Sequence, residues 1–339
     1  MTDITIYDIA KEAGVSPATV SRVLTNNARV SDRKRQVIEK TIKKYNYKPN
    51  AAARSLSGGT RVIGLMVADI RNPFFAALAV ECEIAANMRG YTVLLCNMLV
   101  DEALEEEHLD KLYAQRVEAI IQIGRRTDMV VSDPDYAEHV KRISRIIPFI
   151  TTGKLEGVDY YSVRINHIQS MKIVMEYLVS LGHREIALVG GVKSVRSTWE
   201  KQNEYINLMK YYKLIFRREF IQEGTYDNTA GYNGMECLLK TDIRPGAVIA
   251  INDECATGAI LAAQDNGFSV PGDISVVGFD NTAHAILIRP PLTTVDYNYP
   301  LMGTTLVDTA IQAARKKNPP REILLDSRLV IRESCRKSG

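Results

Sequence analysis

Four neighbouring side chains near the amino terminus have the chemical groups needed to contact the edges of DNA bases. They are Ala18, Thr19, Ser21 and Arg22. The guanidinium of Arg22 can donate paired hydrogen bonds to O6 and N7 of guanine, and Ala18 and Thr19 offer apolar contact to a thymine methyl group. Because the neighbours of Arg22 are small or hydroxylic, this face can approach base pairs closely. These side chains therefore predict a surface that recognises base sequence in the major groove.

Two short predicted helices would position this face. Residues 6–13 carry apolar side chains at helical spacing, and the run stops at Gly14, which can adopt a positive φ. Ser16 is a candidate N-cap and Pro17 suits the first helical position, so a second helix is expected through Leu24. This arrangement is typical of a helix-turn-helix, whose second helix enters the major groove. A small three-helix bundle that uses the pattern only to fold is the alternative.

Charge is distributed unevenly along the chain. The first sixty residues hold eleven Lys and Arg against five Asp and Glu, whereas the whole chain has a net charge of only +3. The remainder is therefore mildly acidic. A basic end on an acidic body is expected when one segment meets phosphates.

An alanine-rich segment, residues 50–57, follows Pro49 and a third predicted helix at about 32–45. A helix this short is marginal in water, because isolated helices need about 12–15 residues, so it requires a partner to persist. Leu56 is its one large apolar side chain. It could pack on the following domain, or it could wedge between base steps in the minor groove and kink the duplex.

From Arg61 onward, short β-branched runs alternate with helical stretches. This alternation predicts an α/β body with two parallel sheets covered by helices on both faces. The predicted strands are 62–67, 93–96, 119–123, 148–152, 186–189, 248–251 and 274–279. The predicted crossover helices include 75–89, 167–182, 253–267 and 300–317.

The chain resembles the lactose-repressor (LacI/GalR) family of transcriptional regulators. The resemblance is carried by TIYDIAKEAGVSPATVSRVL (5–24), YKPNAAARSL (47–56), GYTVLLCN (90–97), LGHREIA (181–187), VPGDISVVGFDN (270–281) and PLTTV (291–295). It implies that Tyr7, Tyr47 and Asn50 hold phosphates. It also implies that Ser16, Thr19, Arg22 and Ala53 lie at bases or sugar, beside Pro17, Ala18 and Ser21. Leu56 would be the wedge of a hinge helix.

The resemblance also implies a domain order. A helix-turn-helix domain would span 1–49, a hinge helix and linker 50–60, and a two-lobed, periplasmic-binding-protein-like effector and dimerisation domain 61–339. Crossings between lobes are expected near 161–163, 291–293 and 325–328. The first lobe would comprise 61–162 and 293–326, and the second lobe 163–292 and 327–339. A homodimer, or a dimer of dimers, would bind a pseudo-palindromic operator in double-stranded DNA.

Candidate residues for a small-molecule site follow the predicted strands, because open parallel sheets bind ligands beyond the carboxyl ends of their strands. The candidates are Asp69, Asn72, Phe74, Phe75, Arg125, Trp199, Lys201, Asn252, Asp253 and Asp280. Aromatic faces with convergent polar groups suit a hydroxyl-rich or heterocyclic ligand. Phe74 and Phe75 could instead belong to the core, and Asp253 and Asp280 could cap local structure.

Three departures from the family pattern bear on the ligand. Gly153 and Lys154 stand where Asp and Arg are common, Asn166 where Asp is usual, and Lys201 where Arg is usual. A lysine cannot reproduce a bidentate guanidinium contact. A sugar or sugar derivative is the expected effector, and Arg125, Lys154 and Lys201 leave an anionic sugar acid or phosphate open. A co-repressed sensor of nucleobases is a further alternative.

Other functional classes are not favoured by the sequence. It lacks the dinucleotide-binding, P-loop and nucleophile-elbow motifs, so no enzymatic activity and no cofactor are expected. Its five cysteines include no Cys-x-x-Cys spacing, which argues against a zinc site. No signal peptide or membrane span is recognised, so a cytoplasmic location is expected. A solute-binding protein that shares the two-lobed body is the remaining alternative.

Overall fold

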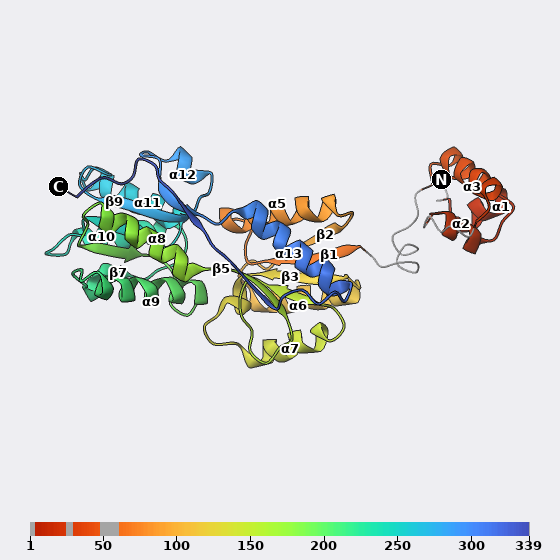
Figure 1. Cartoon of the computed structure of the whole chain (residues 1–339), viewed down its shortest axis with the longest axis horizontal. Helices are drawn as coiled ribbons and strands as arrows, with labels where there is room; N and C mark the ends of the chain where they lie inside the picture. The colour runs from red at the N-terminus through yellow and green to blue at the C-terminus, as the bar shows by residue number, and fades with distance from the viewer. Residues whose placement is uncertain (1–3, 25–29, 48–60, 339) are drawn as a thin grey trace. The chain divides into compact units, whose positions relative to one another are not determined.

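The computed structural model describes residues 4–24, 30–47 and 61–338. The chain falls into two units, Met1–Arg61 and Val62–Gly339, which are called the headpiece and the body below (Figure 1). The predictions for Asn50, Ala53, Leu56 and the hinge helix lie outside the described residues. Within the described ranges, no helix is long and apolar enough to cross a membrane.

The described part of the headpiece consists of short helices around a small apolar core. These are α1 (Ile6–Glu12), α2 (Pro17–Leu24) and α3 (Asp32–Lys44). Each helix contributes one fully buried side chain to the point where they meet, namely Ile9, Val20 and Ile38. Gly14 has a φ of +65° in the turn between α1 and α2. The predicted helix-turn-helix is confirmed.

Polar side chains determine where the first two helices begin. Thr5 and Asp8 form a capping box at α1, in which the Asp8 carboxylate accepts a hydrogen bond from the Thr5 amide at 2.8 Å. At α2, the Ser16 hydroxyl accepts a hydrogen bond from the Thr19 amide at 3.3 Å. The cap at Ser16 fixes the start of α2 and therefore which of its side chains face outward.

The first lobe of the body is a parallel sheet between two helical layers. Its strands are β1 (Val62–Val67), β2 (Thr92–Asn97), β3 (Ala119–Ile123), β4 (Phe149–Thr151), β5 (Tyr161–Ile165) and β11 (Glu322–Leu325). They lie in the order β11-β5-β4-β3-β1-β2. One face is covered by α5 (Pro73–Met88) and α13 (Tyr299–Ala314), and the other by α6 (Glu102–Ala114) and α7 (Pro134–Ser144) (Figure 1). Burial on both faces explains the continuous apolar runs of β1 and β3.

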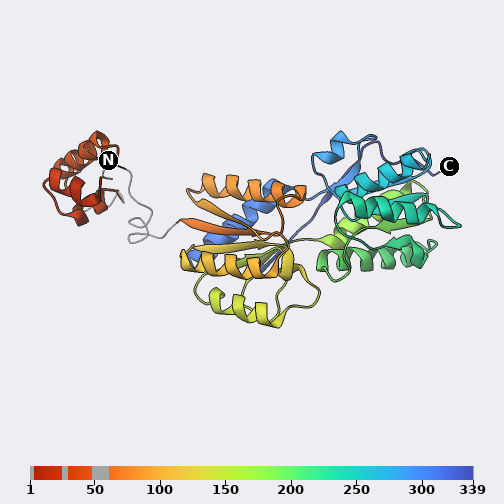
Figure 2. The same ribbon diagram turned by 180° about the vertical axis from the view of Figure 1, so that it is seen from behind.

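The second lobe repeats this layered arrangement. Its strands are β6 (Ile186–Val189), β7 (Ile221–Gln222), β8 (Ala247–Ala250), β9 (Ser275–Asp280), β10 (Thr293–Asp296) and β12 (Arg328–Val330). They lie in the order β12-β10-β9-β8-β6-β7, in which only β12 is antiparallel to its neighbour. One face is covered by α8 (His167–Ser180) and α9 (Arg196–Tyr211), and the other by α10 (Asn228–Leu239) and α11 (Asp253–Asp265) (Figure 2). The prediction of two largely parallel sheets is confirmed.

Three segments cross between the lobes, at residue 166, at 297–298 and at 326–327. The predicted crossings near 161–163 and 291–293 are wrong by a few residues, because the first lies within a strand and the second directly precedes one. Residues 161–165 form β5 of the first sheet, and 293–296 form β10, which pairs with β9 in the second sheet. The first lobe therefore extends through the end of β5 at Ile165, not 162, and resumes with α13 at Tyr299, not 293.

Candidate functional site

The outward face of α2 carries the side chains that were predicted to contact DNA. Ser16, Pro17, Ala18, Thr19, Ser21 and Arg22 are all exposed or half-buried there. The hydroxyls of Ser16 and Thr19 lie 2.9 Å apart. Tyr7 on α1 is 70% exposed, whereas Tyr47 packs partly against the headpiece core. Their contacts with nucleic acid stay predictions.

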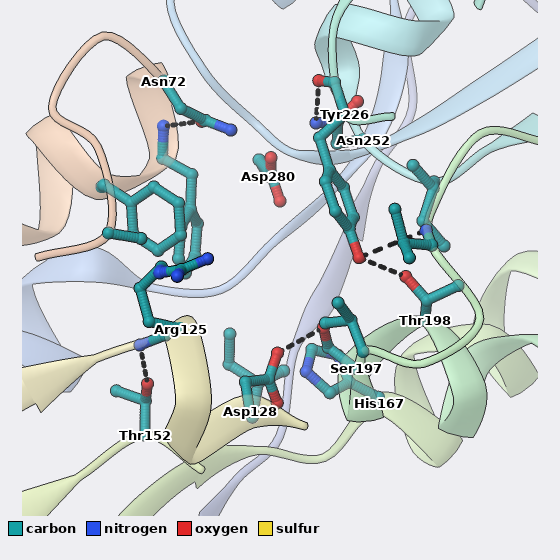
Figure 3. A pocket seen from close by; sticks show the side chains of 18 of the residues that line it. Asn72, Arg125, Asp128, Thr152, His167, Ser197, Thr198, Tyr226, Asn252 and Asp280 are labelled. Carbon is teal, nitrogen blue, oxygen red and sulfur yellow. Dashed lines mark hydrogen bonds between the residues drawn. The ribbon is translucent and has the colours of Figure 1, made fainter. Parts of the chain in front are cut away.

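A cavity of about 530 Å³ lies between the two lobes of the body. Residues that follow strands of both sheets form its walls (Figure 3). Among the predicted candidates, those that line the cavity are Asn72, Phe74, Phe75, Arg125, Lys201, Asn252 and Asp280. They converge because the carboxyl ends of both parallel sheets face the gap between the lobes.

Three predicted residues do not line this cavity. The Asp69 carboxylate instead pairs with the Arg71 guanidinium at 2.5 Å. Asp253 is completely buried, where its carboxylate accepts hydrogen bonds from the Thr282 amide at 2.7 Å and the Thr294 hydroxyl at 2.5 Å. Trp199 is 40% exposed on α9. Its neighbour Thr198 lines the cavity, and an effector contact of Trp199 stays a prediction.

The first-lobe wall combines an aromatic cluster with one cation. The rings of Phe74 and Phe75 pack edge to face with centroids 5.1 Å apart, and Phe74 also packs against Tyr297. Asn72 caps α5 by accepting a hydrogen bond from the Phe74 amide at 3.0 Å. The Arg125 guanidinium reaches from the end of β3 into the cavity (Figure 3). This wall therefore offers apolar surface and hydrogen-bond donors.

The second-lobe wall places a cation near a carboxylate. The Lys201 ammonium donates a hydrogen bond to the Ile251 carbonyl at 3.1 Å and lies 4.2 Å from the centre of the Phe279 ring. Burial lowers the pKa of Lys201, and the charge of Asp280 opposes this shift. Burial also raises the pKa of Asp280 well above its usual value, and the charge of Asp253 raises it further. Within the described residues, no group donates a hydrogen bond to the Asp280 carboxylate.

Contacts between the lobes close one side of the cavity. The Val130 amide donates a hydrogen bond to the Ser194 carbonyl at 2.9 Å, and the Arg196 guanidinium donates to the Val130 carbonyl at 2.8 Å. The Ser197 hydroxyl donates to the Asp128 carboxylate at 2.7 Å (Figure 3). Burial raises the pKa of Asp128 to about 6, although the Ser197 hydrogen bond opposes the shift. The lobes are thus held together by polar contacts near the cavity.

Several cavity residues were not predicted from the sequence. Asp128 belongs to a short 3₁₀ helix, η1 (Arg125–Asp128), and His167 begins α8 directly after β5. The hydroxyls of Thr198 and Tyr226 lie 2.8 Å apart in the second-lobe wall. The rule that ligand groups follow strands would have found His167 and Tyr297 if β5 and β10 had been recognised as strands.

Two of these residues present unpaired polar atoms. Among the described residues, nothing forms a hydrogen bond with the buried Nδ1 of His167 or the hydroxyl of Tyr297. Burial holds the pKa of His167 well below its usual value, so its imidazole is neutral. Buried polar atoms without partners are costly, so they indicate groups that a ligand can satisfy. By contrast, no cluster of metal-ligating side chains occurs in the part of the chain that the structure describes.

The departures from the family pattern have local explanations. A Cβ at Gly153 would lie 1.8 Å from the Thr127 carbonyl oxygen, so no larger residue fits without a shift of the backbone. Lys154 does not line the cavity; its ammonium lies 3.7 Å from the Glu322 carboxylate. Asn166 caps α8 by accepting a hydrogen bond from the Gln169 amide at 3.1 Å. The anionic-ligand hypothesis therefore loses one of its three cations.

Comparisons with known proteins agree with this two-part architecture. A model of bacterial regulatory proteins of the lacI family matches residues 5–50, and a periplasmic binding protein-like domain matches residues 175–335. The HTH-type transcriptional repressor PurR of Proteus mirabilis (strain HI4320) is 31% identical, over 97% of this chain and 96% of its own length. The chain belongs to the LacI family.

Other members of the LacI family align over most of the chain. Catabolite control protein A of Priestia megaterium is 35% identical, over 86% of this chain and 87% of its own length. The crystal structure of the Lac repressor dimer bound to operator and the anti-inducer ONPF superposes with a TM-score of 0.86 and 27% identity, covering 99% of this chain and 100% of that one. As a LacI-family member, the chain is a transcriptional regulator with a helix-turn-helix headpiece and a periplasmic-binding-protein-like body. These similar proteins are regulators rather than enzymes.

The buried carboxylate of Asp128 predicts a pH dependence of body stability. Its pKa of about 6 in the folded body exceeds the ordinary value of 3.8, so the folded state holds a proton that the unfolded state has lost between these values. This contribution to stability is present at low pH and is lost as pH rises through 6. The free energy of unfolding of the wild type should therefore contain a contribution that decreases as the pH rises from about 4 to 6. This contribution should be absent in Asp128→Asn. Thermal unfolding at several pH values, compared with the exposed-site control Asp242→Asn, measures it. A wild-type and an Asp128→Asn profile of equal slope would contradict the prediction.

Proposed function

We propose that the chain is a sequence-specific repressor that binds operator DNA through its headpiece and a small-molecule effector between the lobes of its body. The observation that carries the proposal is the presence, in one chain, of an exposed helix-turn-helix face and a cavity whose walls come from two lobes. A relative that aligns over 97% of the chain is called a transcriptional repressor, and the similar Lac repressor structure is described as bound to operator and an anti-inducer. Acting on DNA, the chain would work in the cytoplasm and catalyse no reaction.

In this proposal, α2 lies in the major groove. Arg22 and its neighbours Ala18 and Thr19 face the bases, because they lie on the outward surface of that helix. Tyr7 contacts a phosphate, because its side chain is exposed and its hydroxyl can reach the DNA backbone. Segment 50–57, which lies outside the described residues, is the proposed switch between the headpiece and the body.

The proposed effector is a sugar or a sugar derivative. A hydroxyl group both donates and accepts hydrogen bonds, and the cavity presents both kinds of partner. Asp280 can accept from it, whereas Arg125 and Lys201 can donate to it. The aromatic edges of Phe74 and Phe75 also suit a planar heterocycle, so a nucleobase is the second candidate. An effector can change operator affinity only through its different affinities for the lobe arrangements.

A second copy of the chain is the proposed partner of an exposed apolar surface on the first lobe. Val80, Ile84 and Met88 are exposed at four-residue intervals, so they share one face of α5, and Leu95 is exposed on the edge strand β2. Clustered apolar side chains on a surface indicate an interface. A two-fold dimer would present two α2 helices to the two halves of a pseudo-palindromic operator.

Replacing Arg22→Ala tests the reading face. The variant should lose about 1–3 kcal/mol of discrimination between operator and unrelated DNA, because the paired donors to guanine are removed. Competition binding, with an operator selected by the wild-type protein from random DNA, measures this. Lys43→Ala, at an exposed lysine on α3 outside the reading face, serves as the control, since loss of a positive charge there should weaken binding to all sequences alike. An unchanged sequence preference in Arg22→Ala would refute the base-reading role.

A thermal-shift screen of sugars, sugar acids, sugar phosphates and nucleobases tests the cavity. A compound that binds only the folded state raises stability by about 2.7 kcal/mol at one hundred times its Kd. The shift should be lost in Asp280→Asn and retained in Asp242→Asn, an exposed substitution on the same lobe. Equal shifts in both variants would place the ligand elsewhere. A response to nucleobases alone would replace the proposed ligand class.

Replacing Ile84→Glu tests the dimer. A charge at the centre of the apolar face should leave the body folded and monomeric in sedimentation velocity. Operator affinity should fall by about 10²–10⁴-fold, because the two headpieces no longer bind as a linked pair. Ile146→Glu is the matched control, since Ile146 is 67% exposed and lies away from α5 on the segment after α7. A dimeric Ile84→Glu variant would rule out this surface as the interface.

A further inference from the structure

Two adjacent arginines that follow β3 share one buried carboxylate. Glu105 on α6 is completely buried. Its Oε2 lies 3.3 Å from Nε of Arg126 and 3.7 Å from Nε of Arg125. Although they are neighbours in the chain, Arg126 is buried in the lobe, whereas the Arg125 guanidinium extends into the cavity (Figure 3).

Arg126 is fixed by contacts from both helices on its side of the sheet. Its guanidinium donates hydrogen bonds to the Glu106 carboxylate at 2.9 Å and to the Asp133 carboxylate, next to α7, at 3.4 Å. It also stacks over the Tyr136 ring, 4.0 Å from the centroid. These contacts leave Arg126 with little freedom to move away from Glu105.

The buried negative charge of Glu105 needs the nearby positive charge of Arg126. Burial raises its pKa, and the charges of Arg126 and then Arg125 are the largest opposing influences. Gln122 on β3 also donates a hydrogen bond to Glu105 at 2.6 Å. Removing one partner of a buried charge leaves a strong demand for another cation. Arg125 is the next cation within reach.

The Arg125 guanidinium, by contrast, is poorly satisfied. Within the described part of the chain, no oxygen accepts a hydrogen bond from it, and its buried Nε has only the longer ion-pair contact of 3.7 Å with Glu105. Its backbone has a φ of +61°, which turns the side chain out of the line of β3 toward the cavity. Arg126 is thus held by contacts within the lobe, whereas the Arg125 guanidinium still has hydrogen-bond donors for a ligand.

We propose that Arg126 is a positioning residue: by occupying Glu105, it keeps the neighbouring Arg125 guanidinium available to an oxygen acceptor of a ligand in the cavity. The acceptor would be a hydroxyl, carbonyl or oxyanion oxygen, because a guanidinium only donates. The inference rests on the proposed function, since it assigns Arg125 to the effector. Without Arg126, Glu105 draws Arg125 back into the lobe and the cavity loses its first-lobe cation.

Chemical modification tests this in the full-length protein without a known effector. Phenylglyoxal adds to the two terminal nitrogens of an accessible guanidinium, and the adduct at each arginine is quantified by peptide mass spectrometry. Arg126→Gln should slow modification of Arg125 severalfold. The double variant Glu105→Gln with Arg126→Gln should return it close to the wild-type rate, because the competing carboxylate is gone. Arg184, exposed on the second lobe, provides the internal reference.

The double variant separates positioning from general structural damage. If Arg126 only stabilised the fold, adding Glu105→Gln to Arg126→Gln would not return the rate of Arg125 modification toward the wild-type rate. That result would overturn the proposal. An unchanged Arg125 rate in Arg126→Gln would overturn it as well. If Arg126→Gln does not fold, Glu105→Gln alone should speed modification of Arg125, and an unchanged or slower rate contradicts the proposal. Because no arm uses an effector, a failed ligand screen would refute the proposed function and leave this result intact.

Discussion

Hydrogen bonds between the crossing segments set the distance and angle between the two sheets of the body. The Asn166 amide donates to the Leu325 carbonyl at 2.9 Å, and its side chain donates to the Asp326 carboxylate at 2.9 Å. The hydroxyls of Ser170 and Ser327 lie 2.6 Å apart. These bonds join segments that are far apart in sequence, so the lobes cannot separate on this side without breaking them. The connection orients the carboxyl ends of both sheets, so the cavity residues at strand ends inherit their positions from it.

A second set of polar contacts joins the lobes on the opposite side of the cavity. There, the segment after η1 meets the start of α9 through backbone hydrogen bonds and the pair of Asp128 and Ser197. The first lobe thus contributes Arg125 and Asp128 from one short segment that also contacts the second lobe. A ligand that engages Arg125 therefore acts on the same segment that holds the lobes together. This shared segment gives a physical route from ligand binding to lobe arrangement.

Sequence patterns predicted the fold well because its determinants are periodic. Buried parallel strands give continuous apolar runs, and the turn at Gly14 marks the helix-turn-helix. Cavity residues were predicted where they lie at or after the end of a long strand, as for Arg125 and Asp280. His167 and Tyr297 were missed, because β5 and β10 resemble linkers between lobes. Trp199 was expected in the cleft but is not among the residues that line the cavity, because the rotation of α9 about its axis is decided by packing against the sheet, which local sequence does not reveal.

The tight contact at Gly153 limits how this pocket can evolve. A new side chain there would collide with the Thr127 carbonyl, which is backbone and cannot rotate away. Position 153 is therefore closed to single substitutions, however useful a carboxylate there would be for a new ligand, although its neighbour Thr152 lines the cavity. Variation in ligand preference must come from other positions, such as Thr152, the segment around Arg125 and the second-lobe wall. Laboratory selection for altered effectors should accumulate its substitutions at residues that line the cavity and leave Gly153 unchanged.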